Sequence, residues 1–148
     1  MKFLSLLVSV FLFTAFAHQP SAAIPVNITI TDIKPDKNGV VIISIYKVAE
    51  NFPYKPYETV KVDKSTMVGG ILTYDFKVSA AGKYAISLLD DLNENDDMDY
   101  NFFGIPKEGY GFSNDAGPRG FSPPNFEDAA FEVGENGTNI TTKMKYFL

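Results

Sequence analysis

VVIISIYKV, residues 40–48, is nearly all apolar and rich in β-branched side chains. Such a run is typical of a central β-strand that is buried on both faces. Around it lie stretches in which apolar and polar residues alternate, the pattern of half-buried strands. They are VNITITDI (26–33), TVKVD (59–63), ILTYDFKV (71–78), KYAISLL (83–89), DAAFEV (128–133) and TNITTKMKYF (138–147).

The spacing of these stretches predicts an all-β fold of about seven strands with no amphipathic helix. Asn38-Gly39 is a strong signal for a hairpin turn, and Gly69-Gly70 predicts a second turn. We therefore expect a single-domain antiparallel β-sandwich of the transthyretin or immunoglobulin-like kind. A small closed barrel is the alternative.

The first 23 residues have the layout of a secretory signal peptide. A positive start at Lys2 is followed by the apolar run FLSLLVSVFLFTAFA (3–17) and then by small residues. Cleavage fits after Ala17 or after Ala23, and we favour Ala23 because strand-like alternation starts right after it. An N-terminal anchor is the alternative, although the run is shorter than the roughly 20 residues of a bilayer span. We expect a signal peptide over 1–23 and a β-sandwich domain over 24–148.

Composition limits which cellular compartments and which classes of function we expect. The chain has no Cys and a net charge of −5, which becomes about −6 without Lys2. We expect a bacterial protein that is secreted or periplasmic, binds no nucleic acid and does not insert into a membrane after signal cleavage. The one His is His18, so the mature chain has no Ser-His-Asp triad, no Cys nucleophile and no His or Cys zinc ligands. No catalytic constellation is visible, and we expect no enzyme.

DDLNENDDMD, residues 90–99, contains six acidic residues and no basic one. Alternate residues of its last nine positions carry side-chain oxygens, as in calcium loops of the form D-x-[DN]-x-[DN]. Mutual repulsion of these carboxylates also calls for a cation or for wide solvent exposure. We therefore expect a structural Ca²⁺ rather than Mg²⁺, and a solvated acidic turn is the alternative. The predicted ligands are Asp91, Asn93, Asn95, Asp97 (by its carbonyl) and Asp99.

The stretch departs from the EF-hand pattern at two positions. Asp96 stands where Gly permits the sharp turn, although Asp tolerates a positive φ. Phe102 stands where a Glu would bind with both oxygens. The missing carboxylate would have to come from the long segment that follows, as Glu108, Asp115 or Glu127.

Residues 100–126 are rich in Gly, Pro and aromatics and have little strand pattern. Loops of this length are usually functional or disordered, and so many rings argue against disorder. We expect an ordered loop whose rings mostly form a second small core, with Tyr100 and Tyr110 the most exposed. Stacking on sugars or on an extended peptide is the functional alternative for these rings, which are Tyr100, Phe102, Phe103, Tyr110, Phe112 and Phe121.

Motifs follow one another from Gly82 onward. They are G-x-Y-A at 82–85, D-x-N-x-N with a further Asp at 91–99, G-x-P-x-E-G-Y-G-F-S-N at 104–114 and P-x-F-x-x-A at 124–129. This order resembles an uncharacterised family of exported bacterial proteins, domain-of-unknown-function family 2141. The resemblance implies an exported β-sandwich and no particular activity. That family usually has His where this chain has Asp90, and Gly where it has Asp96, which bears on ligand geometry rather than on the fold.

These observations predict an exported, calcium-stabilised binding or structural module whose partner is an unknown protein or polysaccharide. One alternative is a lectin-like or carbohydrate-active protein that uses the acidic and aromatic loop. Another is a purely structural envelope protein with no ligand.

Overall fold

The computed structural model describes residues 23–36, 38–120 and 122–147. The predicted signal peptide therefore lies, apart from Ala23, outside the described residues. The strands are β1 Ile24–Thr31, β2 Val40–Tyr46, β3 Glu58–Asp63, β4 Leu72–Val78, β5 Gly82–Asp91, β6 Gly109–Phe112, β7 Phe131–Val133 and β8 Thr138–Lys143. The helices are η1 Ala49–Asn51, η2 Lys64–Thr66, η3 Ser113–Asp115 and α1 Phe126–Ala129.

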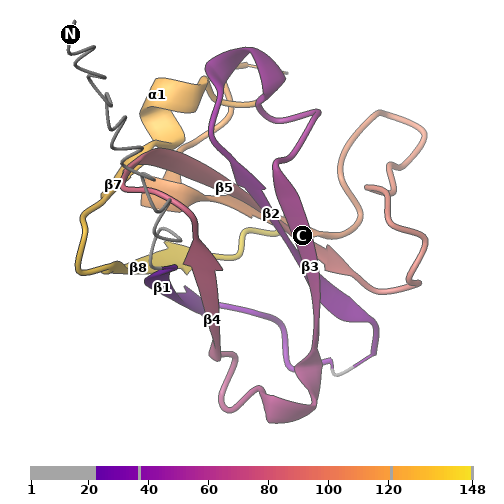
Figure 1. Cartoon of the computed structure of the whole chain (residues 1–148). Helices are drawn as coiled ribbons and strands as arrows, with labels where there is room; N and C mark the ends of the chain where they lie inside the picture. Colours follow the sequence, from indigo (N-terminus) through magenta and orange to yellow (C-terminus); the bar gives the residue numbers. More distant parts are fainter. Residues whose placement is uncertain (1–22, 37, 121, 148) are drawn as a thin grey trace, which may run out of the picture.

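The strands form two sheets, and the all-β sandwich prediction is confirmed. The smaller sheet has the order β4-β1-β8, and the larger has the order β3-β2-β5-β6. β7 pairs the first residues of β5, and β6 pairs its later part. Figure 1 shows β4, β1 and β8 together on one side of the molecule and β2, β3 and β5 on the other. No helix among the described residues is long and apolar enough to span a bilayer.

The inner faces of the two sheets meet in one apolar core. Alternate residues of each strand point into it, including Ile28 and Ile30 of β1, Ile43 and Ile45 of β2, and Ile86 of β5, all fully buried. The stretch at 40–48 is β2, which pairs β3 on one side and β5 on the other. Its central place explains why it is apolar on both faces.

Two details of strand pairing differ from the expectation. Asn38-Gly39 does not close a hairpin, because β1 lies in the smaller sheet and β2 in the larger, so residues 32–39 cross between the sheets. β1 and β8 run parallel, whereas the other strand pairs run antiparallel. A parallel pair needs a long connection, and almost the whole chain supplies it here.

The segment at 100–126 is more structured than predicted. It contains β6, which pairs the end of β5, and the short helix η3, and α1 starts at its end. The sequence signal for β6 is weak because Gly109 and Gly111 alternate with rings. A Cβ on Gly109 would lie 2.4 Å from the Tyr146 ring, and one on Gly111 would lie 2.6 Å from the Lys143 carbonyl oxygen. Glycine lets β6 approach the C-terminal segment, and Tyr110 stays on the outer face.

Candidate functional site

Strand β5 ends in two carboxylates that point to opposite faces. Asp90 shares its face with Ile86 and Leu88 of the core, and Asp91 lies on the outer face, as strand alternation requires. Both residues are fully buried. The acidic stretch is therefore divided at its first two residues into an inner and an outer part.

In the outer part, the side chain of Asp91 organises the loop that follows. Its Oδ1 accepts from the N–H of Asn95 at 3.2 Å, and its Oδ2 accepts from that of Asp96 at 2.9 Å. Asn93 Oδ1 also accepts from the Asn95 N–H at 3.2 Å, so oxygens of Asp91 and Asn93 surround one donor. Glu94 and Asp96 both have a positive φ, at 59° and 67°, which makes the turn tight.

Asp99 closes the other end of this loop. Its carboxylate receives the amide of Asn93 at 2.8 Å and that of Asn95 at 3.5 Å. The Asp97 carboxylate instead accepts from the backbone N–H of Met98 at 2.8 Å. The structure thus brings together the four predicted side-chain ligands at positions 1, 3, 5 and 9 of the loop.

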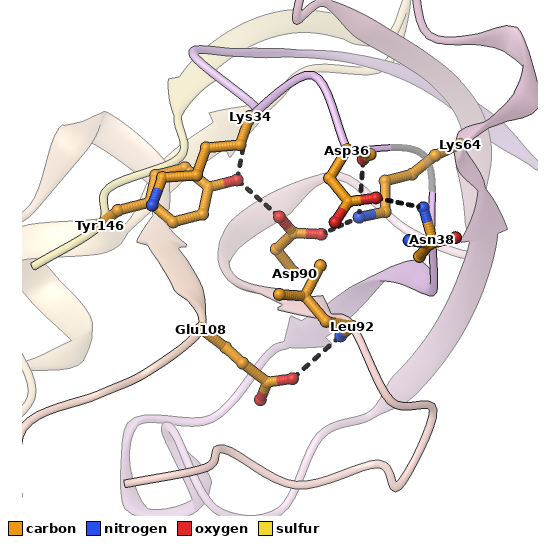
Figure 2. Close-up of polar contacts among 8 residues, drawn as sticks. All are labelled: Lys34, Asp36, Asn38, Lys64, Asp90, Leu92, Glu108 and Tyr146. Atoms are coloured by element: carbon orange, nitrogen blue, oxygen red, sulfur yellow. Dashed lines mark hydrogen bonds and ion pairs between the residues drawn. The ribbon is translucent and has the colours of Figure 1, made fainter. Parts of the chain in front are cut away.

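Glu108 anchors the acidic loop through hydrogen bonds to its backbone. Its side chain is buried and accepts from the Leu92 N–H at 2.9 Å, as Figure 2 shows. It also accepts from the Asp99 N–H at 3.1 Å, so one carboxylate bridges both ends of the loop. Of the three residues considered for the missing carboxylate, Glu108 alone lies at the loop. Asp115 binds a backbone N–H of β8, and Glu127 pairs with an exposed lysine of β5.

Lys61 of β3 is a cation at the edge of the loop. Its Nζ lies 2.5 Å from Oδ1 of Asp96. The Asp96 side chain raises the pKa of the Lys61 ammonium above its usual value, and the charges of Asp91 and Glu94 act in the same direction. Part of the crowded negative charge is therefore balanced within the chain.

The donor set of the loop fits a hard cation in its chemistry. Asp91, Asn93, Asn95 and Asp99 offer only oxygens as ligands, which Ca²⁺ prefers. In the part of the chain that the structure describes, no group of three or more His, Cys, Asp or Glu residues gathers into a metal cluster. The two asparagine amides, backbone carbonyls and water would therefore have to complete the coordination.

In the inner part, Asp90 belongs to a buried polar network that the sequence did not predict (Figure 2). Its Oδ1 lies 2.5 Å from Nζ of Lys64, a fully buried residue of η2, and its Oδ2 accepts from the Tyr146 hydroxyl at 2.6 Å. Lys64 also donates to the Asp36 carbonyl at 3.3 Å, and the Lys34 N–H donates to the Tyr146 hydroxyl at 3.0 Å. The network joins both sheets at this end of the sandwich.

A groove of about 590 Å³ lies on the outer face of the larger sheet. One wall is formed by residues between 96 and 106 and includes the end of the acidic loop. The other wall is formed by Pro118, Gly120, Ser122 and Pro123. Figure 1 shows the segment after β5 projecting on the right, away from the smaller sheet. The floor consists of outward side chains of β2, β5 and β6, namely Ile42, Ser44, Tyr46, Ser87, Leu89, Tyr110 and Phe112.

The aromatic residues of 100–126 divide into two groups. Phe112 packs against Phe52 with ring centroids 5.8 Å apart, and so joins a second small core. Phe102 and Phe103 are 96% and 82% exposed, so the prediction that most of these rings form a core is wrong for this pair. The two rings pack edge-to-face on each other, with centroids 5.5 Å apart.

The two tyrosines expected to be most exposed differ from each other. Tyr100 is exposed, as predicted. Tyr110 is half-buried, because its ring stacks on that of Phe147 in the C-terminal segment, with centroids 5.7 Å apart. Phe121 lies outside the described residues.

Comparison with protein families matches residues 28–141 to the model described as "Uncharacterized protein conserved in bacteria (DUF2141)". The chain belongs to the DUF2141 family. Neither the curated proteins nor the solved structures give a match.

The motif at 104–114 of this DUF2141 protein has mainly structural roles. Ser113 is fully buried; its hydroxyl accepts from the Ile86 N–H at 2.9 Å and donates to the Ala129 carbonyl. Asn114, with φ of 58°, donates to the Ala130 carbonyl at 2.6 Å. Together with Glu108, these contacts fix the acidic loop, β6 and α1 against β5, which positions the groove.

Tyr146 gives the buried network a dependence on alkaline pH. Burial, and then the hydrogen bond to Asp90, raises the pKa of the phenol above its usual value of about 10. The unfolded chain loses this proton above pH 10 while the folded chain keeps it, so stability falls as the pH rises past that value. Between about pH 8 and about pH 11, we expect Tyr146→Phe to lose less free energy of unfolding in urea than the wild type.

Tyr54→Phe is the matched control for this experiment, because Tyr54 is exposed and lies outside the network. It should retain the wild-type slope. Equal slopes for the wild type and Tyr146→Phe would contradict the assignment.

Proposed function

We propose that this protein is an exported binding module that holds a neutral carbohydrate chain in the groove, between loops that a Ca²⁺ ion stabilises. One observation carries the proposal: the groove is lined by several aromatic rings, and none of its described lining residues is basic. Phe103, Tyr100 and Tyr54 present exposed rings at its walls.

The lining suits sugar rings in two ways. Aromatic faces pack against the apolar C–H faces of sugars, and tyrosine hydroxyls keep a polar tip for their hydroxyl groups. Ser44, Ser87 and Ser122 add hydroxyls along the groove, and Asp96 and Asp97 add acceptors. These two carboxylates would repel an anionic polymer, which favours a neutral chain.

The position of the carboxylates favours binding over hydrolysis. Glycosidases place two carboxyl groups on either side of the bond that they cleave. Asp96 and Asp97 are neighbours on one loop, and Asp96 is already paired with Lys61.

The calcium ion in this proposal would tie the acidic loop to the groove. Asp91, Asn93, Asn95 and Asp99 would contribute side chains, and Asp97 its carbonyl. Support comes from their spacing and from the convergence of the four side chains. Since residues 96–106 form a wall of the groove, an ion here would stabilise the ligand-binding surface.

The signal-peptide pattern of residues 1–23 supports a secreted or periplasmic location, which would expose the groove to envelope or environmental polysaccharides. A purely structural envelope protein is the competing interpretation. It predicts that no oligosaccharide binds.

Binding can be tested by calorimetry with neutral cello-, xylo-, malto- and chito-oligosaccharides and with an anionic oligogalacturonide. We expect one neutral series to bind and Phe103→Ala to weaken that binding about tenfold, because a stacked ring contributes about 1.5 kcal/mol. Phe102→Ala is the matched control, since Phe102 is also an exposed phenylalanine of this loop but does not line the groove. Absence of binding throughout the panel, or equal loss in both variants, would refute the proposed site.

Calcium can be tested by thermal unfolding in EDTA and in about 5 mM Ca²⁺. A ligand that binds the folded state at about 100 times its Kd adds about 2.7 kcal/mol of stability, so we expect a rise of several degrees in Tm. Asp99→Asn should abolish the rise, while Asp97→Asn, which removes the same charge from a side chain that is not a proposed ligand, should keep it. An unchanged wild-type Tm would leave the acidic loop as a solvated turn.

A further inference from the structure

Lys64 and Asp90 are an amine and a carboxyl group held together out of water. Nζ lies 2.5 Å from Oδ1, and the two side chains are 0% and 1% exposed. The groove and the acidic loop make no use of this pair. A buried ion pair is held at a high desolvation penalty, which an uncharged product would remove.

We propose that Lys64 and Asp90 join in an intramolecular isopeptide bond. The reaction is a condensation that needs no oxidant, reductant or co-reactant. In the first step a proton moves from the ammonium to Oδ1 of the carboxylate, which gives an amine beside a carboxylic acid. Nζ then bonds to Cγ, the bond from Cγ to Oδ1 breaks, and Oδ1 leaves as water with two protons that began on Nζ.

The contact brings the two reacting groups together in the folded chain. A nucleophile that already lies against the carboxyl group reacts with a high effective concentration and without diffusion. Tyr146 contacts the other oxygen, Oδ2, at 2.6 Å. Its own oxygen accepts from the Lys34 N–H, which leaves the hydroxyl proton directed at Asp90.

Tyr146 therefore has a defined role at the reacting group. Negative charge develops on Oδ2 when Nζ adds to Cγ, and a fixed O–H donor stabilises it. After loss of water, Oδ2 becomes the amide carbonyl oxygen and can keep the same donor. The raised pKa of the Tyr146 phenol agrees with a hydroxyl that stays protonated.

The bond would connect parts of the fold that hydrogen bonds alone now join. Lys64 lies in η2, between β3 of the larger sheet and β4 of the smaller, and Asp90 lies in the central strand β5. The link would close a covalent ring over residues 64–90. The chain contains no Cys, so disulfides do not supply such a link.

Mass spectrometry of the purified full-chain protein under denaturing conditions tests the proposal. We expect the wild type to be about 18 Da, one water, lighter than its sequence requires, and Lys64→Arg and Asp90→Ala to have their full masses. Trypsin should not cleave after Lys64 and should release a branched peptide of 62–77 joined to 84–107. Full mass for the wild type with ordinary peptides would overturn the proposal, as would an 18 Da loss that persists in Lys64→Arg.

Tyr146→Phe separates the chemical role of the hydroxyl from packing, because it keeps the ring. In this variant we expect the branched peptide to form at least tenfold more slowly after synthesis, in protein that is folded by circular dichroism. Formation at the wild-type rate would overturn the role given to Tyr146. The masses are measured on denatured protein. The wild-type result therefore does not depend on how well any variant folds.

Discussion

The contact between Lys64 and Asp90 is the constraint on which this sandwich depends most. Both groups are fully buried, so neither can be hydrated if the other is removed. Lys64 follows β3 on the way to β4, Asp36 lies between β1 and β2, and Tyr146 follows β8. The network thus brings three segments together around the end of β5. They are the β1–β2 connection, the β3–β4 connection and the C-terminal segment after β8.

That position also determines the surface that we assign to binding. Since β5 presents Asp90 to the core, strand alternation presents Asp91 to the outer face, where it organises the acidic loop. Glu108 then anchors both ends of that loop and leads directly into β6, which lines the groove. The core and the groove wall are therefore positioned by consecutive residues of one strand.

The sequence predicts the sheet architecture well because alternation reports burial directly. The pattern at 40–48 correctly gave a central strand, and the alternating stretches gave β1, β3, β4 and β5 near their observed bounds. The strand predicted at 138–147 extends past the end of β8 at Lys143, and the one predicted at 128–133 starts in α1 and is a strand only at Phe131–Val133. The turn at Asn38-Gly39 misled, since local turn chemistry does not reveal which sheet receives the next strand. In the structure, β2 pairs β3 and β5 and so lies in the larger sheet, whereas β1 lies in the smaller one.

The site was predictable only where local spacing carries the information. Four predicted ligands converge because they lie within one tight loop. Lys64 gave no signal, because a lysine after an alternating strand usually lies in solvent and only tertiary packing buries it. The exposure of Phe102 and Phe103 was also hidden, since aromatic content alone does not distinguish a core from a binding surface.

A double-mutant cycle at Lys64 and Asp90, followed by urea unfolding, tests the central claim most directly. We predict that Lys64→Met and Asp90→Leu each cost about 3–5 kcal/mol, because each leaves one buried group without its partner and also removes the proposed bond between them. The double variant should be more stable than either single variant, since it leaves neither charge unpaired. Additive losses, or single losses below about 1 kcal/mol, would contradict the account.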